Sequence, residues 1–340
     1  MQPFQFSRTS DLQSAYSAYR AADADETTVH SRSQYLAGGT TLLDLMKLGV
    51  MRPDRVVDIN DLDRTNAGRI EFAGDRLRLG ALTRMSTVAD HPDVRRDFPV
   101  IAQSLQLAAS AQIRNMASLG GNVLQRTRCT YFRDTSYSNC NKRNPGSGCA
   151  ALDGINRPHA VLGTSERCIA TYPGDFAQAL IALDAHVEVA GRNGAREFPF
   201  AKLHRQPGQT PHFETTLAPD ELITVFRIAR APFTRRSLFL KVRDRQSFEF
   251  ALASAAVALD LDGDTVRQVR IALGGVATVP WRAHEAEASL INQRLDETAT
   301  RRAADLAFAD ARPREHNAFK VELGKRTLIR ALRQAGVMEI

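Results

Sequence analysis

The spacing of apolar residues in the first sixty positions predicts strands that alternate with helices. A short strand is expected at residues 4–6, followed by a helix that is capped at position 9 or 10 and runs through Arg20. Residues 34–47 then predict a strand, a Gly-Gly turn and an amphipathic helix, and residues 55–59 predict another strand. The last three elements would form a unit of the β-α-β type.

The rest of the chain divides into two regions with different patterns. Up to about Pro232, alternation and helical periodicity predict hairpins and single strands mixed with helices, at residues 69–82, 85–90, 98–111, 175–183, 186–200 and 221–229. Beyond it, three strands precede three helices, at residues 238–242, 248–261, 266–274, 285–289, 298–309 and 318–334. We therefore predict an α+β fold: two α/β subdomains in residues 1–229, then a C-terminal domain, residues 230–340, with a three-stranded antiparallel sheet and a helix bundle.

Composition and charge exclude several classes of function. The net charge of +7 is spread over 340 residues without a run of five or six basic side chains, which argues against nucleic acid binding. No apolar run is long enough to span a membrane, and the first residues lack the pattern of a secretory signal, so export would require the signal of a partner. The HExxH and GxSxG motifs are both absent.

Two Gly-Gly pairs, at residues 38–39 and 120–121, stand out as candidate phosphate sites. Each lies beside a hydroxyl residue, Thr40 or Ser118, and the first precedes a helix that Thr40 or Thr41 would cap. Glycine lets the backbone approach a phosphate closely, and free N–H groups at a helix start favour an anion. The two pairs could clamp one pyrophosphate from both sides, although two unrelated turns would give the same pattern, and neither matches a dinucleotide or P-loop fingerprint.

All four cysteines of the chain lie in one segment of about forty residues: Cys129, Cys140, Cys149 and Cys168. The segment is rich in Arg, Asn, Gly, Ser and Pro, which is typical of a long loop that needs something to hold it. Three interpretations remain open on spacing alone, namely an iron–sulfur cluster, a zinc ion and two disulfides. The flanking cations favour a bound anionic group, as a cluster with four thiolates would be, but also suit a solvated loop: Arg126, Arg128, Arg133, Lys142, Arg143, Arg157 and Arg167.

Three motifs in order carry a family resemblance. They are residues 37–47 (Ala-Gly-Gly-Thr-Thr-Leu-Leu-Asp-Leu-Met-Lys), residues 118–122 (Ser-Leu-Gly-Gly-Asn), and Gly174-Asp175 followed by Ala-Leu-Asp-Ala at residues 182–185. Nearly the whole chain resembles the medium, FAD-binding subunit of the molybdenum hydroxylases, the family of xanthine dehydrogenase, carbon monoxide dehydrogenase and aldehyde oxidoreductase. The resemblance implies a PCMH-type FAD-binding domain followed by a C-terminal domain like that of the carbon monoxide dehydrogenase flavoprotein.

The cysteine segment narrows the resemblance further. Its phrases Leu-Gln-Arg-Thr-Arg-Cys (124–129), Tyr-Phe-Arg-Asp (131–134), Cys-Asn-Lys-Arg (140–143) and Pro-Gly-Ser-Gly-Cys (145–149) are similar to a loop inserted in the flavin subunit of bacterial periplasmic-type aldehyde oxidoreductases. That loop, here about residues 123–169, carries a 4Fe–4S cluster in the family, which implies the ligands Cys129, Cys140, Cys149 and Cys168. The flavin subunit of 4-hydroxybenzoyl-CoA reductase also carries such a loop and is the nearest rival.

The resemblance also implies the residues that bind FAD: Leu36, Ala37, Gly38, Gly39, Thr40, Thr41, Leu42, Ser118, Gly120, Gly121, Asn122, Asp175, Ile223 and Lys241. The two glycine motifs would bind the pyrophosphate and ribityl chain through backbone N–H groups and hydroxyls. Asp175 would accept hydrogen bonds from the adenosine or ribityl side, Ile223 would pack on the flavin, and Lys241 would lie at its pyrimidine edge and stabilise negative charge.

The function implied is electron transfer within a complex. An aldehyde would be oxidised to a carboxylic acid at a molybdenum cofactor on a large subunit, and electrons would pass through 2Fe–2S clusters of a small subunit to FAD on this chain and then to an external acceptor. No catalytic residue beyond FAD is expected here. The alternative is the flavin subunit of an enzyme like 4-hydroxybenzoyl-CoA reductase or xanthine dehydrogenase. The complex would be periplasmic, by co-export with a signal-bearing partner, or cytoplasmic.

Overall fold

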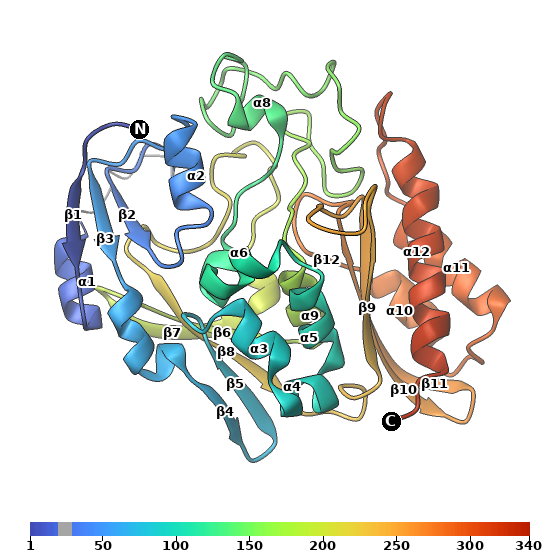
Figure 1. Cartoon of the computed structure of the whole chain (residues 1–340). Coiled ribbons are helices and arrows are strands. Elements are labelled where there is room, and N and C mark those ends of the chain that lie inside the picture. Colours follow the sequence, from blue (N-terminus) through green and yellow to red (C-terminus); the bar gives the residue numbers. More distant parts are fainter. Residues whose placement is uncertain (20–28) are drawn as a thin grey trace.

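Three sheets organise the part of the chain described in the computed structural model, residues 1–19 and 29–340. Figure 1 shows them in chain order: a small sheet at the N-terminal end, a five-stranded sheet with helices on it, and a C-terminal sheet covered by long helices. The predicted α+β class is confirmed, and the division at residues 229 and 230 stays a prediction.

The N-terminal sheet is parallel throughout. Its strands β1 (Gln5–Arg8), β2 (Ser33–Leu36) and β3 (Arg55–Asp58) pair in the order β1-β3-β2. The helices are α1 (Leu12–Ala18) and α2 (Leu42–Lys47), so the predicted β-α-β unit is β2-α2-β3. The cap of α1 is Asp11, whose carboxylate accepts a hydrogen bond from the Ser14 N–H at 2.8 Å, instead of position 9 or 10. The predicted helix end at Arg20 lies outside the described residues.

The five-stranded sheet is antiparallel and has the order β4-β5-β8-β6-β7. Its strands are β4 (Ile70–Ala73), β5 (Arg76–Gly80), β6 (His186–Gly191), β7 (Gly194–Pro199) and β8 (Leu222–Ala229). Its helices are α3 (Met85–Asp90), α4 (Pro92–Asp97), α5 (Pro99–Gln106), α6 (Ala111–Met116), α7 (Leu119–Val123) and α9 (Phe176–Ala182). Short 3-10 turns are η1 (Asn60–Arg64), η2 (Asn66–Gly68) and η3 (Phe200–Lys202).

The single helix predicted over residues 98–111 is wrong, because the chain breaks there. Helix α5 ends at Gln106, and Ala109 has a φ of 48°, in the left-handed region that a helix interior does not tolerate. Ser110 then begins α6 as its cap, accepting a hydrogen bond from the Ile113 N–H at 3.3 Å. The break turns the chain so that α6 leads into the second glycine motif.

The C-terminal sheet has four antiparallel strands instead of the three predicted. They are β9 (Ser237–Val242), β10 (Ala253–Asp262), β11 (Thr265–Gly274) and β12 (Trp281–Arg282), in the order β12-β11-β10-β9. Helices α10 (His284–Leu290), α11 (Glu297–Ala307) and α12 (Phe319–Gly336) follow. The inner strand β10 packs on both faces, since Ala256 and Ala258 join the core under α5 and α9, whereas Val257 and Leu259 join the core under α12.

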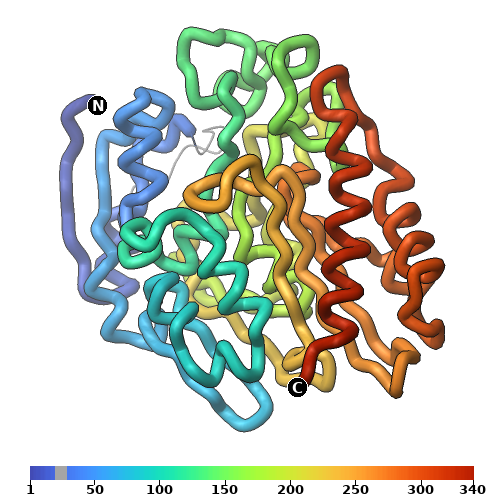
Figure 2. The backbone as a smooth tube through the Cα atoms, turned by 45° about the vertical axis from the view of Figure 1, so that its right-hand side comes forward, coloured from blue at the N-terminus to red at the C-terminus, as the bar shows by residue number. Residues whose placement is uncertain are grey.

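The loop that carries the cysteines contains one short helix, α8 (Thr130–Arg133), and projects at the top of the molecule between α2 and α12 (Figures 1 and 2). It is tied to the N-terminal unit by Arg133, whose Nη1 lies 2.8 Å from Asp44 Oδ2. It is tied to the C-terminal helices by the fully buried Lys320, whose Nζ donates to the Pro158 carbonyl at 2.9 Å. Burial lowers the pKa of Lys320 to about 7.

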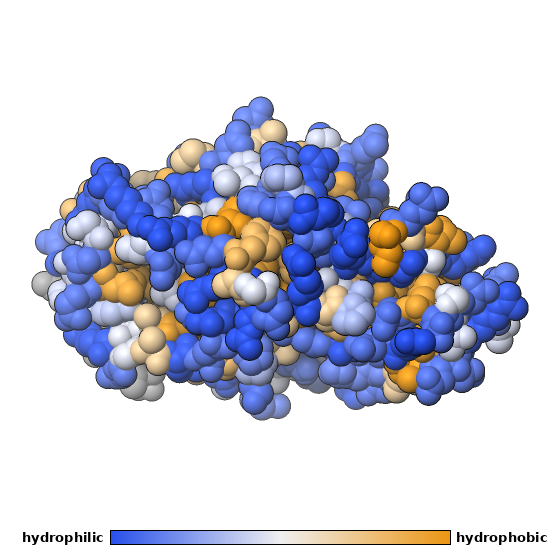
Figure 3. Space-filling model, turned by 90° about the horizontal axis from the view of Figure 1, so that it is seen from below, coloured by the Kyte–Doolittle hydropathy of each residue, from blue (hydrophilic) through white to orange (hydrophobic). Residues whose placement is uncertain are grey.

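The surface has no broad apolar face in the view from below, where small apolar groups are separated by polar side chains (Figure 3). None of the described helices combines the length and the apolar character that crossing a bilayer requires.

Candidate cofactor-binding site

A cavity of about 480 Å³ opens where the three parts of the chain meet, within the size range of cofactor sites. Its walls come from both glycine motifs, the start and end of the cysteine loop, residues 204–223 and the turn before β12. Ten of the predicted FAD-binding residues line it: Ala37, Gly38, Gly39, Thr40, Thr41, Leu42, Ser118, Gly120, Gly121 and Ile223. The structure therefore brings together two motifs that are eighty residues apart in the sequence.

The first glycine motif presents open backbone donors. It follows β2 directly, and Gly39 turns the chain with a φ of 73°, which favours glycine. Among the described residues, no partner is found for the backbone N–H groups of residues 38–42. Thr41 occupies the cap position of α2, as predicted, but its side chain makes no capping hydrogen bond. This segment can accept an anion through consecutive N–H groups.

The second glycine motif differs from the prediction, because its backbone donors are already used. The N–H of Leu119 donates to Thr83 O at 3.0 Å, and that of Gly120 to Ala81 O at 2.7 Å. Ser118 caps α7 by accepting the Gly121 N–H at 3.1 Å. What this motif offers a ligand is the Ser118 hydroxyl and the open space beside residues that have no Cβ.

The two motifs touch through their backbones. A Cβ atom on Gly38 would overlap the carbonyl oxygen of Met116, two residues before Ser118. Two side chains outside the predicted motifs reinforce this contact: Arg84 donates to Met116 O at 2.7 Å and to Asn60 Oδ1 at 2.9 Å. Asn60 in turn donates to Ala37 O at 3.0 Å, so one chain of hydrogen bonds joins both motifs.

Four predicted residues do not line the cavity: Leu36, Asn122, Asp175 and Lys241. Leu36 packs against the apolar cluster under α2, and Asn122 lies 3.4 Å from the sulfur of Met85. Asp175 and Lys241 bind each other, with Oδ2 and Nζ 2.6 Å apart and side chains only 4% and 1% exposed. Burial raises the pKa of Asp175, against the opposing effect of Lys241 and Arg243. In the structure this ion pair links the start of helix α9 to strand β9 of the C-terminal sheet.

The cavity wall also carries a largely buried group of three charged side chains. Glu214 lies 2.6 Å from Arg126 Nε and 2.8 Å from Lys142 Nζ. Burial opposes ionisation of Glu214, but the two cations hold its pKa below the usual value. In the sequence, Arg126 and Lys142 were recognisable only as cations of the cysteine loop. Glu214 stands in a polar loop where no motif indicates that it binds anything.

The four cysteines line a second, smaller cavity, which also contacts Lys142 and Ala170. All four are free thiols, Cys140 pairs with Cys149 across an isolated β-bridge, and His159 Nε2 lies 3.1 Å from Cys129 Sγ. Burial raises the pKa of Cys129 to about 12, so its thiolate needs a bound cation to compensate for the loss of water.

The four thiols supply the number of ligands that a four-iron cluster needs. Within residues 1–19 and 29–340, no three His, Cys, Asp or Glu side chains are arranged to hold a metal ion. The ligands of a four-iron cluster bind four different iron atoms and therefore lie farther apart than the ligands of one ion. Four cysteines around one cavity are compatible with this wider spacing of ligands. The set of cluster ligands stays a prediction.

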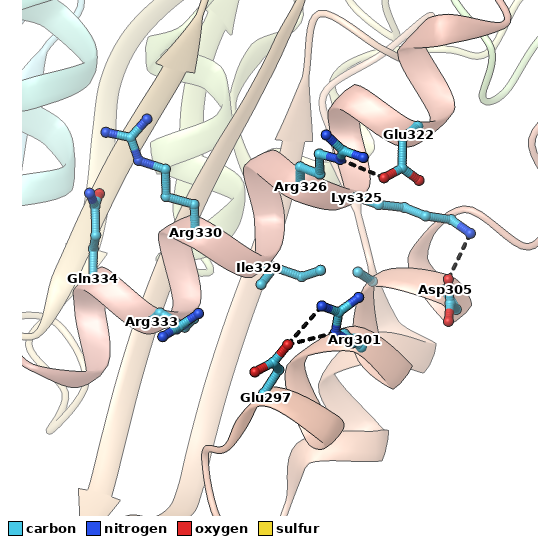
Figure 4. Close-up of a pocket in the computed structure, with 11 residues that line it drawn as sticks. Glu297, Arg301, Asp305, Glu322, Lys325, Arg326, Ile329, Arg330, Arg333 and Gln334 are labelled. Atoms are coloured by element: carbon cyan, nitrogen blue, oxygen red, sulfur yellow. Dashed lines mark hydrogen bonds and ion pairs between the residues drawn. The ribbon is translucent and has the colours of Figure 1, made fainter.

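A third hollow, between α11 and α12, has a different character (Figure 4). Its acidic side chains each pair with a neighbouring cation, as in Glu297–Arg301 at 2.7 Å and Asp305–Lys325 at 2.7 Å. Figure 4 shows these side chains extended along the helix surfaces. We interpret it as a solvated helix–helix groove.

Comparisons with known proteins give matches over most of the chain. Residues 2–230 match the FAD binding domain in molybdopterin dehydrogenase, and residues 239–335 match the C-terminal domain of the carbon monoxide dehydrogenase flavoprotein. The chain is 45% identical over 304 residues to the aldehyde oxidoreductase FAD-binding subunit PaoB of Escherichia coli (strain K12), which covers 89% of this chain and 91% of that protein. It is 26% identical to the carbon monoxide dehydrogenase medium chain of Hydrogenophaga pseudoflava, over 84% and 81% of the two chains. A solved carbon monoxide dehydrogenase structure from that organism has the same fold, with a TM-score of 0.74 at 24% identity over 98% of this chain and 97% of that one.

Proposed function

The chain belongs to the FAD-binding subunits of the molybdenum hydroxylase family, and from this premise we propose that it is the flavin subunit of an aldehyde oxidoreductase complex. The observation that carries the proposal is the cavity between the two glycine motifs, with the open N–H groups of residues 38–42 on one side and the Ser118 hydroxyl on the other. The 45% identity to PaoB supports an aldehyde as the substrate of the complex.

This chain's part in the reaction is to bind and orient FAD. The open N–H groups would bind the pyrophosphate, the only anionic group of oxidised FAD, and glycine at positions 38 and 39 lets the backbone come close. Ser118 would donate from the opposite wall, while Ile223, 7% exposed at a bulge in β8, offers an apolar contact for the ring. FAD supplies the chemistry when bound, since it takes electrons from a donor centre and passes them to an acceptor.

The proposal includes a 4Fe–4S cluster held by Cys129, Cys140, Cys149 and Cys168. It is supported by the shared cavity of the four thiols and by the cations around it. The proposed partners are a large subunit with the molybdenum cofactor, a small subunit with 2Fe–2S clusters and an external electron acceptor. We also propose a periplasmic location by co-export with a signal-bearing partner; cell fractionation that finds the complex in the cytoplasm would contradict it.

Cofactor analysis of the purified complex tests the proposal. We expect one FAD per chain, four irons per chain beyond those of the small subunit, and oxidation of aldehydes with an artificial electron acceptor. A preparation without a flavin absorption band would refute the flavin function. Activity confined to purines or to aromatic coenzyme A thioesters would instead favour the subunit of a xanthine dehydrogenase-like or 4-hydroxybenzoyl-CoA reductase-like enzyme.

A further inference from the structure

The flavin cavity and the cysteine cavity share a wall. Two residues, Lys142 and Ala170, line both, and Lys142 follows Cys140 by two positions while Ala170 follows Cys168 by two. Any centre held by the thiols is therefore separated from the flavin cavity by a single layer of residues at this point. A charged side chain in that layer therefore contributes to the electrostatic potential in both cavities.

The layer carries a group of three largely buried charges. Lys142 Nζ lies 2.8 Å from Glu214 Oε1 and donates to Pro211 O at 3.1 Å, which holds the ammonium group in place. Arg126 lies on the other side of Glu214, with its guanidinium 5.0 Å from the ring centroid of Phe132. Side chains of Arg126, Lys142 and Glu214 are 7%, 11% and 22% exposed. Two cations and one carboxylate leave a net charge of +1 in a region that water screens little.

We propose that Lys142 sets the reduction potentials of the two redox centres on either side of this layer, and that Glu214 limits its effect. This inference rests on the proposed function, because it needs a flavin in one cavity and a cluster in the other. Reduction of a cluster adds one electron and one negative charge without making or breaking a bond. Reduction of the flavin by two electrons takes up one proton from solvent, which forms an N–H bond, and leaves one negative charge on the ring. A fixed cation beside the cavity favours these reduced forms, and a fixed anion disfavours them.

Two substitutions that change the charge of this group in opposite directions test the inference. We would compare Lys142→Gln and Glu214→Gln in the purified holo-complex by titration with dithionite, reading the flavin by visible absorption and the cluster by electron paramagnetic resonance. Lys142→Gln removes a positive charge and is expected to lower both midpoint potentials. For the cluster we expect at least a tenfold change in the reduction equilibrium, about 59 mV for one electron. Glu214→Gln removes a negative charge and is expected to raise both potentials.

Two further variants separate electrostatics from structural damage. Lys142→Arg keeps the charge and should keep potentials near those of the wild type. Arg157→Gln removes a charge from the same loop at a residue that lines neither cavity, where Arg157 pairs with Asp244 at 2.7 Å, and should leave the potentials unchanged.

Shifts of the same sign in both Gln variants, or no shift in either, would overturn the inference. If a variant loses its iron, the flavin potential alone decides between these outcomes. A wild-type complex with FAD and iron whose variants titrate identically refutes this inference only. A wild-type complex with neither cofactor refutes the proposed function and this inference with it.

Discussion

Gly38 and Met116 meet backbone to backbone, so the absence of a side chain at one position decides whether two distant motifs can form one cavity. A Cβ at Gly38 would have no flexible atom to displace, because it would meet the carbonyl group of Met116. This relationship, more than a direct contact with a ligand, explains why glycine stands at position 38.

Replacing Gly38 with alanine should therefore reduce both stability and FAD content. The two backbone segments would have to separate, which we expect to cost at least about 1–3 kcal/mol of unfolding free energy. Gly121→Ala is the control for stability alone, because its Cβ would meet only the Ser118 hydroxyl, at 3.0 Å, whereas Gly121 itself lines the cavity. Thermal unfolding and flavin stoichiometry measure the two effects; a Gly38→Ala protein as stable as the control would contradict the packing argument.

Ser118 should affect FAD affinity beyond its effect on helix α7. Ser118→Ala removes a cap, at a cost of about 0.5–2 kcal/mol, and also removes the hydroxyl that faces the cavity. Ser110→Ala removes the equivalent cap of α6 outside the cavity. We expect similar loss of stability in both variants but weaker FAD binding only in Ser118→Ala, as measured by flavin titration of the apoprotein. Equal affinities would show that Ser118 is only a cap.

Breaking the ion pair between Asp175 and Lys241 should lower the stability of the protein without changing its affinity for FAD. Lys241→Met leaves a buried carboxylate without a partner, which we expect to cost about 3–5 kcal/mol. The double variant Asp175→Asn and Lys241→Met should recover much of that loss. Urea unfolding of single and double variants measures the coupling. Loss of FAD without loss of stability would instead support the flavin contact that the family resemblance implies.

Replacing Cys140 with serine should remove the iron and loosen the loop around it. The side chain lies beside Cys149 at the β-bridge of the cysteine cavity, and serine is a poor ligand for iron in a cluster. Ser138→Ala, an exposed change two residues away, is the control. Iron analysis measures the loss of iron, and limited proteolysis measures the loosening of the loop. A Cys140→Ser protein with full iron content would show that Cys140 is not a ligand.

Stability should fall as pH falls from about 6.5 to about 4, with one contribution from His204 and another from His159, whose pKa burial also lowers to about 4. Burial holds the pKa of His204 at about 4, below the ordinary value of 6.5, while its Nε2 lies 2.9 Å from Val123 O. The unfolded chain binds a proton in this range and the folded chain does not, so unfolding is favoured by roughly 2 kcal/mol more at pH 5 than at pH 7. His204→Gln should flatten this part of the pH profile of thermal unfolding; an unchanged slope would assign it to other groups.

Local patterns along the chain were enough to determine most of the secondary structure. The hairpin β4–β5, the β-α-β unit and the last helix, predicted over residues 318–334 and found at Phe319–Gly336, depend on neighbours in sequence, so periodicity and turn residues reveal them. The predicted strand over residues 248–261 begins only at Ala253, because pairing with β9 and β11 decides where its ladder starts.

By itself, the sequence determined the family, the α+β class, both glycine motifs and the four clustered cysteines, because each is a local pattern. Only the tertiary structure decided which donors remain open, and it assigned them to residues 38–42 and not to the second motif, whose N–H groups bond to Thr83, Ala81 and Ser118. It alone paired Asp175 with Lys241 and brought Glu214 to Lys142. The physical reason is that a hydrogen bond or ion pair depends on which groups packing brings within about 3 Å, and residues far apart in the chain carry no local sign of that proximity.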